Sequence, residues 1–148
     1  MNTKLLSSPS ILISLTIFVL IIRYASGADH TQDSLDKVRE LVAAKKAILV
    51  DVREKIEWDA GHIKGAKWVP MSTLKMKLTD EQLYKLLPKD KLVYLYCAGG
   101  IRCLDVAEML GDRKLELKAL KQGYQTLLKG GFENELPEPD KPVVPTSK

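Results

Sequence analysis

The stretch KLVYLYCAGGIRCLDVAEMLGD, Lys91 to Asp112, indicates the fold class of this chain. Its first part, Lys91 to Cys97, is a short apolar run typical of a buried strand. Small residues follow, and then leucine and methionine recur at helical spacing up to Gly111, the expected helix stop. A strand that passes through a short glycine-containing loop into a helix is typical of a βαβ unit.

The segments on both sides continue this alternation. Further strands are expected at 48–52, 66–70 and 116–120, and helical segments within 31–47, 55–62, 73–90 and 123–132. Thr31 or Asp33 is the expected cap of the first helix, and Thr79 or Asp80 that of a later one. The pattern predicts an α/β fold with a parallel sheet of four to five strands and helices on both faces.

Length and composition indicate one ordinary globular domain. The chain has 148 residues without a visible repeat, 45% of them hydrophobic and 28% charged. Beyond residue 27 there are 21 basic and 19 acidic residues, and the two signs are interleaved along the chain. No basic stripe is present, so the sequence argues against a nucleic-acid partner.

The amino terminus, residues 1–27, has the pattern of a signal peptide. Lys4 precedes a twelve-residue uncharged apolar run, Ile11 to Ile22, and small residues follow at Ala25 to Ala28. The run is shorter than the roughly 20 apolar residues of a membrane span. We therefore expect a periplasmic or otherwise exported protein, with an uncleaved membrane anchor as the alternative.

The remaining chain divides into a folded part and a tail. Residues 28–135 are expected to form the domain. Residues 136–148 contain four prolines and are expected to be an extended, poorly ordered tail.

The loop after the strand ending at Cys97 favours a thiolate. Ala98, Gly99 and Gly100 let the backbone curl tightly and turn its N–H groups inward. The helix that begins near Ile101 adds the positive end of its dipole, and Arg102 adds a full charge. Cysteine pKa values of roughly 3.5–7.5 occur in such surroundings, against about 8.5 for a free cysteine. Because ligands bind beyond the carboxyl ends of parallel strands, Cys97 is a candidate nucleophile.

Several motifs, taken together, resemble the single-domain rhodanese family of sulfurtransferases. They are ILVDVRE at 48–54, Glu57, GHIKGA at 61–66, Pro70, VYLYCAGGIR at 93–102 and LKALKQGYQTLLKGG at 117–131. The resemblance extends over roughly Leu35 to Phe132. An exported domain of this size is also similar to the periplasmic rhodanese of the bacterial phage-shock response.

The resemblance implies thiosulfate sulfurtransferase chemistry at Cys97. The thiolate would attack a small anionic sulfur donor, thiosulfate or a persulfide, and hold the sulfane sulfur as a persulfide. It would then pass the sulfur to cyanide or a thiol. Arg102 would orient the donor, and loop N–H groups would stabilise the anions. The substrate-binding residues implied are Ala98, Gly99, Gly100, Ile101 and Arg102. No cofactor is expected, the protein is expected to be a monomer, and membrane contact is expected only if the signal stays uncleaved.

The spacing within the loop favours sulfur over phosphate chemistry. Related phosphatases and arsenate reductases have C-x5-R, whereas Arg102 follows Cys97 by C-x4-R and Cys103 takes the next position. Two departures from the family pattern stand out. Ala98 replaces a basic residue that many thiosulfate-using members have, and Cys103 replaces a small hydroxyl residue. The edge strand with which the family often begins is expected to be short or missing.

The second cysteine, Cys103, leaves three alternatives open. It is a small buried hydrophobe, a resolving thiol for Cys97, or half of a structural disulfide, which exported proteins often contain. A metal site is not expected, because C-x5-C with only His30 and His62 matches no usual zinc spacing.

Four other residues are predicted to support the loop. Asp51 lies at a strand end near the active face and is expected to hydrogen-bond the loop. Arg53 and Glu57 are four apart and are expected to pair across the start of a short helix. His62 is expected to fix the turn that contains it.

Two other functions remain as alternatives. The first is a rhodanese-fold binding module without turnover, and the second is a thiol–disulfide oxidoreductase that uses Cys97 and Cys103.

Overall fold

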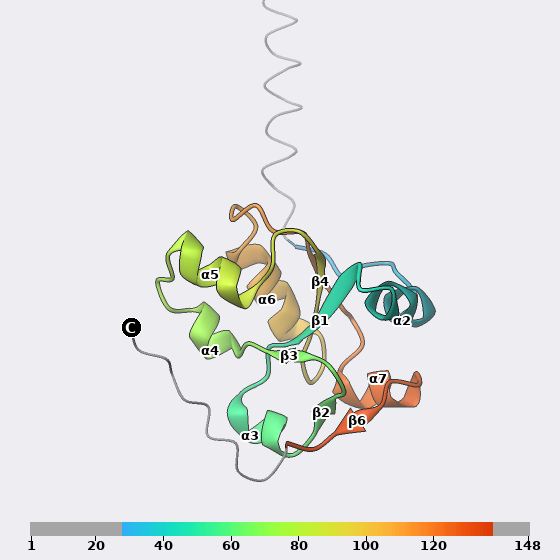
Figure 1. Cartoon of the computed structure of the whole chain (residues 1–148). Coiled ribbons are helices and arrows are strands. Elements are labelled where there is room, and N and C mark those ends of the chain that lie inside the picture. Colours follow the sequence, from blue (N-terminus) through green and yellow to red (C-terminus); the bar gives the residue numbers. More distant parts are fainter. Residues whose placement is uncertain (1–27, 138–148) are drawn as a thin grey trace, which may run out of the picture.

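Four parallel strands form the centre of the structure, a computed structural model that describes residues 28–137 (Figure 1). The strands lie in the order β3 (Lys67–Trp68), β1 (Ala47–Asp51), β4 (Leu92–Tyr96) and β5 (Leu117–Ala119). β1 and β4 pair along their whole length, from Ala47 opposite Leu92 to Asp51 opposite Tyr96. The carboxyl ends of the two central strands therefore lie side by side.

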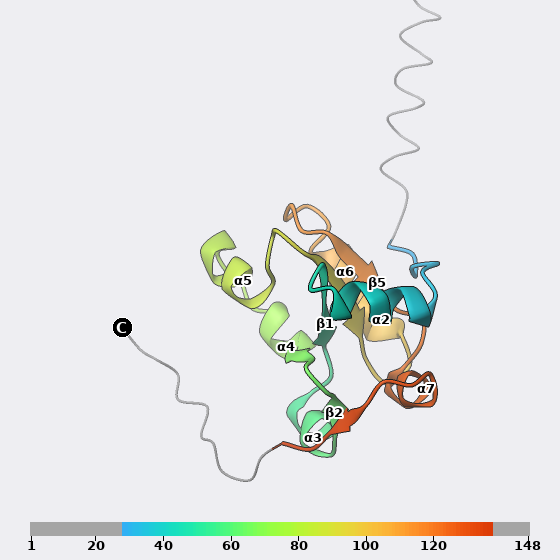
Figure 2. The same cartoon turned by 45° about the vertical axis from the view of Figure 1, so that its right-hand side comes forward.

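Helices cover both faces of this sheet (Figures 1 and 2). One face carries α2 (Leu35–Ala43) and α7 (Tyr124–Lys129), and the other carries α4 (Met71–Leu74), α5 (Asp80–Leu86) and α6 (Ile101–Met109). The short helix α3 (Lys55–Asp59) lies below the sheet in Figure 1 with the antiparallel pair β2 (His62–Ile63) and β6 (Asn134–Glu135). The predicted α/β architecture is confirmed.

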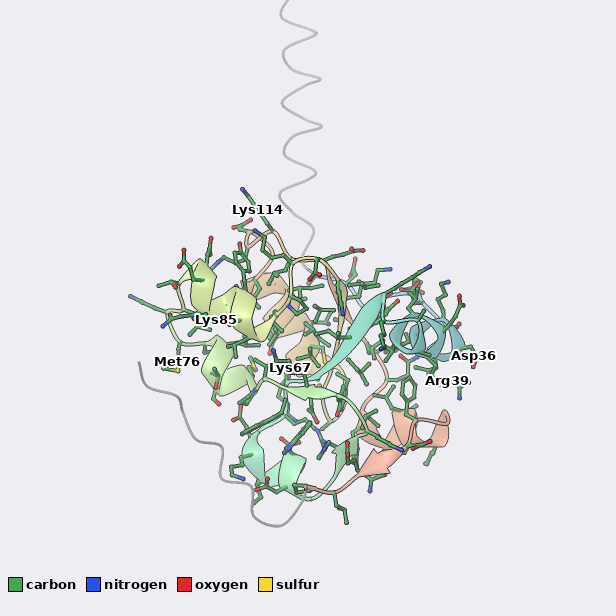
Figure 3. The ribbon with its side chains drawn as sticks, viewed as in Figure 1. Asp36, Arg39, Lys67, Met76, Lys85 and Lys114 are labelled. Atoms are coloured by element: carbon green, nitrogen blue, oxygen red, sulfur yellow. The ribbon has the colours of Figure 1, made fainter. Side chains whose placement is uncertain are left out.

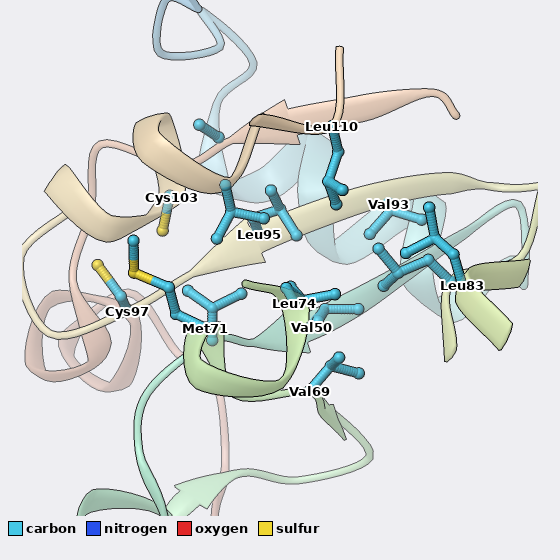
Figure 4. Close-up of a cluster of buried hydrophobic side chains, with 14 residues drawn as sticks. Val50, Val69, Met71, Leu74, Leu83, Val93, Leu95, Cys97, Cys103 and Leu110 are labelled. Carbon is cyan, nitrogen blue, oxygen red and sulfur yellow. The ribbon is translucent and has the colours of Figure 1, made fainter. Parts of the chain in front are cut away.

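The alternation of side chains along the strands divides the core in two. Val50 and Leu95 are fully buried against α4, α5 and α6, while Tyr94 and Tyr96 are buried on the α2 and α7 side. Cys97 and Cys103 both belong to the first of these cores, where apolar side chains surround them (Figure 4).

Side-chain caps begin α2 and α5, and the cap of α2 differs from the prediction. Thr79 caps α5 as predicted, accepting from Gln82 N–H while the Gln82 side chain accepts from Thr79 N–H. The cap of α2 was predicted to be Thr31 or Asp33, but it is Ser34, whose side chain accepts from Lys37 N–H. Thr31 instead continues an edge pairing, its N–H bonding Ala119 O at 2.8 Å beside a single bridge from His30. The edge strand is accordingly reduced to one bridge.

Charged side chains project from the outer faces of the helices (Figure 3). Arg39 pairs with Asp36 on α2, and the Lys67 amine donates to Lys85 O at 2.9 Å. Among the helices of residues 28–137, none is both long and apolar enough to cross a membrane. The predicted signal peptide and residues 138–148 of the predicted tail lie outside the described residues.

Candidate active site

Cys97 directly follows β4, and its loop leads straight into α6. Gly100 caps that helix with φ 91°, a conformation that favours glycine, and a Cβ there would lie 2.7 Å from Lys121 O. On the other side, a Cβ on Gly123 would lie 1.7 Å from Ala98 O, so the two loops are in direct backbone contact. Tyr124 N–H donates to Cys97 O at 2.8 Å. The loop is thus held between β4, α6 and the start of α7.

The sulfur of Cys97 accepts hydrogen bonds that stabilise it as a thiolate. Gly100 N–H donates to its Sγ at 3.1 Å. A hydrogen bond from the Cys103 thiol, followed by bonds from loop N–H groups, lowers the pKa of Cys97 to about 5, although burial opposes the shift. At neutral pH this cysteine is therefore a thiolate. The sequence predicted that the loop N–H groups would favour the thiolate. It did not predict that the Cys103 thiol would contribute.

Cys103 lies in the first turn of α6 and is fully buried. Its sulfur faces that of Cys97 (Figure 4), and both cysteines are free thiols. The hydrogen bond to Cys97, together with burial, raises the pKa of Cys103, so this thiol stays protonated while Cys97 is charged. Of the three predicted alternatives, the structure does not have the disulfide, and a free thiol at this position fits both a buried hydrophobe and a resolving thiol.

The ultraviolet absorbance of the thiolate is expected to report this arrangement. The Cys97 signal should persist at neutral pH and disappear as the pH falls through about 5. Cys103→Ala removes the largest cause of the shift, so it should move the midpoint upward, and Cys97→Ser should remove the transition. A wild-type midpoint of about 8.5–9, where an ordinary cysteine titrates, would contradict the assignment.

Arg102 forms a two-pronged ion pair with Glu57. Its two terminal nitrogens lie 2.6 and 2.7 Å from the two carboxylate oxygens. This contact lowers the pKa of Glu57 and raises the pKa of Arg102, so both groups stay charged. Glu57 also accepts from Glu54 N–H at 3.1 Å, in the capping box of α3. Because Arg102 also interacts with the Cys97 thiolate, the pair connects α3 to the cysteine loop.

Arg53 was predicted to pair with Glu57, and this was wrong. Arg53 precedes α3 and instead forms a buried pair with Asp51, with Nη2 2.6 Å from Oδ2. It also donates to Gly61 O at 2.8 Å, and its guanidinium lies 4.1 Å from the centre of the Tyr124 ring. Asp51 therefore holds Arg53, rather than hydrogen-bonding the cysteine loop as expected.

His62 is buried in β2 and stacks on Trp58 with ring centres 3.4 Å apart. Its Nδ1 lies 3.3 Å from Trp58 O, and its Nε2 lies 3.8 Å from the Glu135 carboxylate. Within residues 28–137 no hydrogen bond joins His62 to the cysteine loop. Its contacts join α3, β2 and β6, which fits the expected role in fixing the chain there.

His30 contacts the loop, which the sequence did not suggest. Its Nε2 lies 3.2 Å from Gly100 O, at the residue that caps the start of α6. The 70 residues between the two positions leave no local signal for this contact. No group of three or more His, Cys, Asp and Glu suited to a metal ion was found among the described residues.

The outer rim of the loop is open. Ala98 and Gly99 are exposed and Ile101 is 72% exposed, whereas the Cys97 residue is only 1% exposed. The predicted substrate-binding residues therefore surround a sulfur at the base of the loop. A hollow of about 430 Å³ lies elsewhere and is lined by Arg39, Val42, Ala43, Ile63, Lys64, Gly131, Phe132 and Glu133.

This geometry defines a class of protein. Its members are parallel α/β domains that hold a thiolate in a short loop at the carboxyl edge of the sheet. Residues 34–134 match the family described as Rhodanese-like domain, so the chain belongs to this family.

Relatives and solved structures agree with this assignment. The chain is 38% identical over 82 residues to the uncharacterized protein YqhL of Bacillus subtilis, covering 55% of this chain and 60% of that one. It is 42% identical over 62 residues to the probable adenylyltransferase/sulfurtransferase MoeZ of Mycobacterium tuberculosis, covering 42% of this chain and 15% of that protein. The chain thus spans less than two thirds of these relatives.

The fold is similar to the crystal structure of a rhodanese-related protein from Thermoplasma volcanium. The TM-score is 0.58 at 27% identity, over 70% of this chain and 95% of that one.

Proposed function

We propose that this domain is a sulfurtransferase that carries sulfane sulfur as a persulfide on Cys97. One observation carries the proposal: the Cys97 sulfur accepts from Gly100 N–H at 3.1 Å at the base of an open loop, where its hydrogen-bond donors lower its pKa to about 5. A stabilised thiolate is the nucleophile that such a transfer needs. The relative MoeZ is described as a probable adenylyltransferase/sulfurtransferase, and this description supports the same chemistry.

The transfer needs two displacements. In the first, the Cys97 thiolate attacks the outer sulfur of thiosulfate, a sulfur–sulfur bond forms, and sulfite leaves with the electron pair of the bond that breaks. In the second, cyanide or a thiolate takes the outer sulfur and the Cys97 thiolate leaves. Because the nucleophile is already ionised, the first step needs no general base.

The loop provides the charge stabilisation for both steps. The N–H groups that hold the thiolate are in place to hold the persulfide anion that replaces it. Arg102 adds positive charge at the same position, and Glu57 fixes its guanidinium. We therefore assign donor orientation to Arg102 and the positioning of Arg102 to Glu57.

We also propose that the domain works outside the cytoplasm. The support is the charge and apolar pattern of residues 1–27. We include in this proposal that the protein is similar to the periplasmic rhodanese of the phage-shock response.

The function is tested by offering thiosulfate and cyanide to the purified chain. Thiocyanate should form, and after thiosulfate with cyanide omitted, acid-quenched peptides of a Cys103→Ser variant should carry one added sulfur at Cys97. Protein whose thiols have been alkylated beforehand is the control and should form no thiocyanate. If neither thiosulfate nor a low-molecular-weight persulfide leaves any modification at Cys97, the binding-module alternative replaces the proposal.

A further inference from the structure

The transfer chemistry uses the Cys103 thiol as a hydrogen-bond donor to Cys97 and leaves its sulfur unused as a nucleophile. It is fully buried, yet its sulfur faces the sulfur that would become the carrier (Figure 4). Its neighbours in this core are otherwise apolar, among them Leu95 and Val106. A hydrogen bond to Cys97 does not exhaust what this group can do, because a sulfur next to another sulfur can also attack it.

Loading of Cys97 with sulfur would convert the atom that Cys103 faces from a thiolate into the inner sulfur of a persulfide. The outer sulfur of the persulfide must be open to an acceptor, and the exposed side of the loop is formed by Ala98, Gly99 and Ile101. The outer sulfur therefore extends toward this rim. The inner sulfur, which is Cys97 Sγ, keeps its place against Cys103 in the core.

We propose that Cys103 is a resolving nucleophile that releases the bound sulfur as hydrosulfide. This inference rests on the proposed function, because it begins from the Cys97 persulfide. The Cys103 sulfur attacks Cys97 Sγ, a Cys97–Cys103 bond forms, and the bond between the inner and outer sulfur breaks. The outer sulfur leaves with that electron pair and the proton lost by Cys103, as hydrosulfide.

The position of the two thiols favours this step over attack from solution. Two sulfurs held in contact react as parts of one molecule, for which effective concentrations far exceed those of dissolved thiols. Cys103 is also closed to solvent, so no external thiol competes for it. Cys103 contacts the inner sulfur of the persulfide and not the outer one. Its attack therefore forms a disulfide with Cys97 and does not transfer the outer sulfur to Cys103.

A second reactant completes the cycle. A small dithiol attacks the disulfide at Cys97, which is the sulfur nearest the open rim, and restores both thiols as it becomes a cyclic disulfide. The net reaction converts thiosulfate and a dithiol into sulfite, hydrogen sulfide and the oxidised dithiol, and the dithiol supplies the two electrons. The domain would then be a thiosulfate–dithiol reductase in addition to a sulfur carrier.

The test follows one turnover of the full chain without cyanide or added thiol. Reduced protein is desalted without oxygen, mixed with one equivalent of thiosulfate, quenched in acid and alkylated. Wild-type protein should release one hydrosulfide per chain, retain no added sulfur, and give a peptide pair joined through Cys97 and Cys103. The Cys103→Ser variant should retain one sulfur atom at Cys97 and release none, and Cys97→Ser should do neither.

The outcomes separate the two proposals. If wild type keeps its persulfide and both variants behave as above, the sulfurtransferase stands and the resolving role is wrong. Added sulfur found on Cys103 would also overturn the role, because it shows attack on the outer sulfur. If no protein gains sulfur or forms the disulfide, the proposed function itself fails. The wild-type peptide pair needs no variant, so it decides the matter even if Cys103→Ser folds poorly.

Discussion

The Cys97→Ser variant is expected to take up no sulfur and to form no thiocyanate. A serine hydroxyl is not ionised at neutral pH, and its oxygen cannot hold sulfane sulfur as a persulfide does. The fold should survive, because serine is similar in size and can still accept from Gly100 N–H. Intact-mass measurement after thiosulfate, beside a thiocyanate assay, checks both parts.

The matched control is Cys103→Ser, which changes the other cysteine in the same way. Its rate will change, because the Cys103 thiol supports the Cys97 thiolate. Its end point should still be one bound sulfur atom. Sulfur uptake by Cys97→Ser, or equal loss of uptake in both variants, would argue against Cys97 as the sole carrier.

Arg53→Met is expected to lower the free energy of unfolding by about 3–5 kcal/mol, since it leaves a buried carboxylate without its partner. The Asp51 side chain is fully buried and that of Arg53 is 5% exposed. The substitution also removes the bond to Gly61 O and the contact with Tyr124. Urea unfolding followed by circular dichroism measures the change.

Two comparisons make this result specific. Arg39→Met breaks the exposed pair with Asp36 on α2 (Figure 3) and should cost less than about 1 kcal/mol. The double variant Asp51→Asn/Arg53→Met should be more stable than Arg53→Met, because no charge is then buried unpaired. Equal losses in the single and double variants would show that the carboxylate is not the cause.

The fold could be predicted because its signals are local. The β-branched run before Asp51 and the run before Cys97 are buried strands in their own right, and Thr79 caps its helix through residues three positions away. The antiparallel pair β2 and β6 was missed. Each strand has two residues, and their pairing depends on a contact between Ile63 and Asn134 that no local pattern encodes.

The ion pairs show where spacing alone misleads. Arg53 and Glu57 satisfy the helical i, i+4 rule, but Glu54 caps the helix, so Arg53 lies outside it. Residues two apart in extended chain lie on the same side, and this periodicity could have suggested the pairing of Arg53 with Asp51. The partner of Glu57 is Arg102, 45 residues away, and only the folded chain brings the two together.

The pairing of Arg102 with Glu57 has a consequence for how the site distinguishes donors by their number of charges. The pair is electrically neutral as a whole, and the residue after Cys97 is the uncharged Ala98. A dianion such as thiosulfate therefore meets hydrogen-bond donors and one shared guanidinium, with no surplus positive charge to balance its second negative charge. A singly charged organic persulfide needs no such balance. If the domain is the sulfurtransferase proposed above, Glu57 is therefore expected to favour sulfur donors with one negative charge over donors with two.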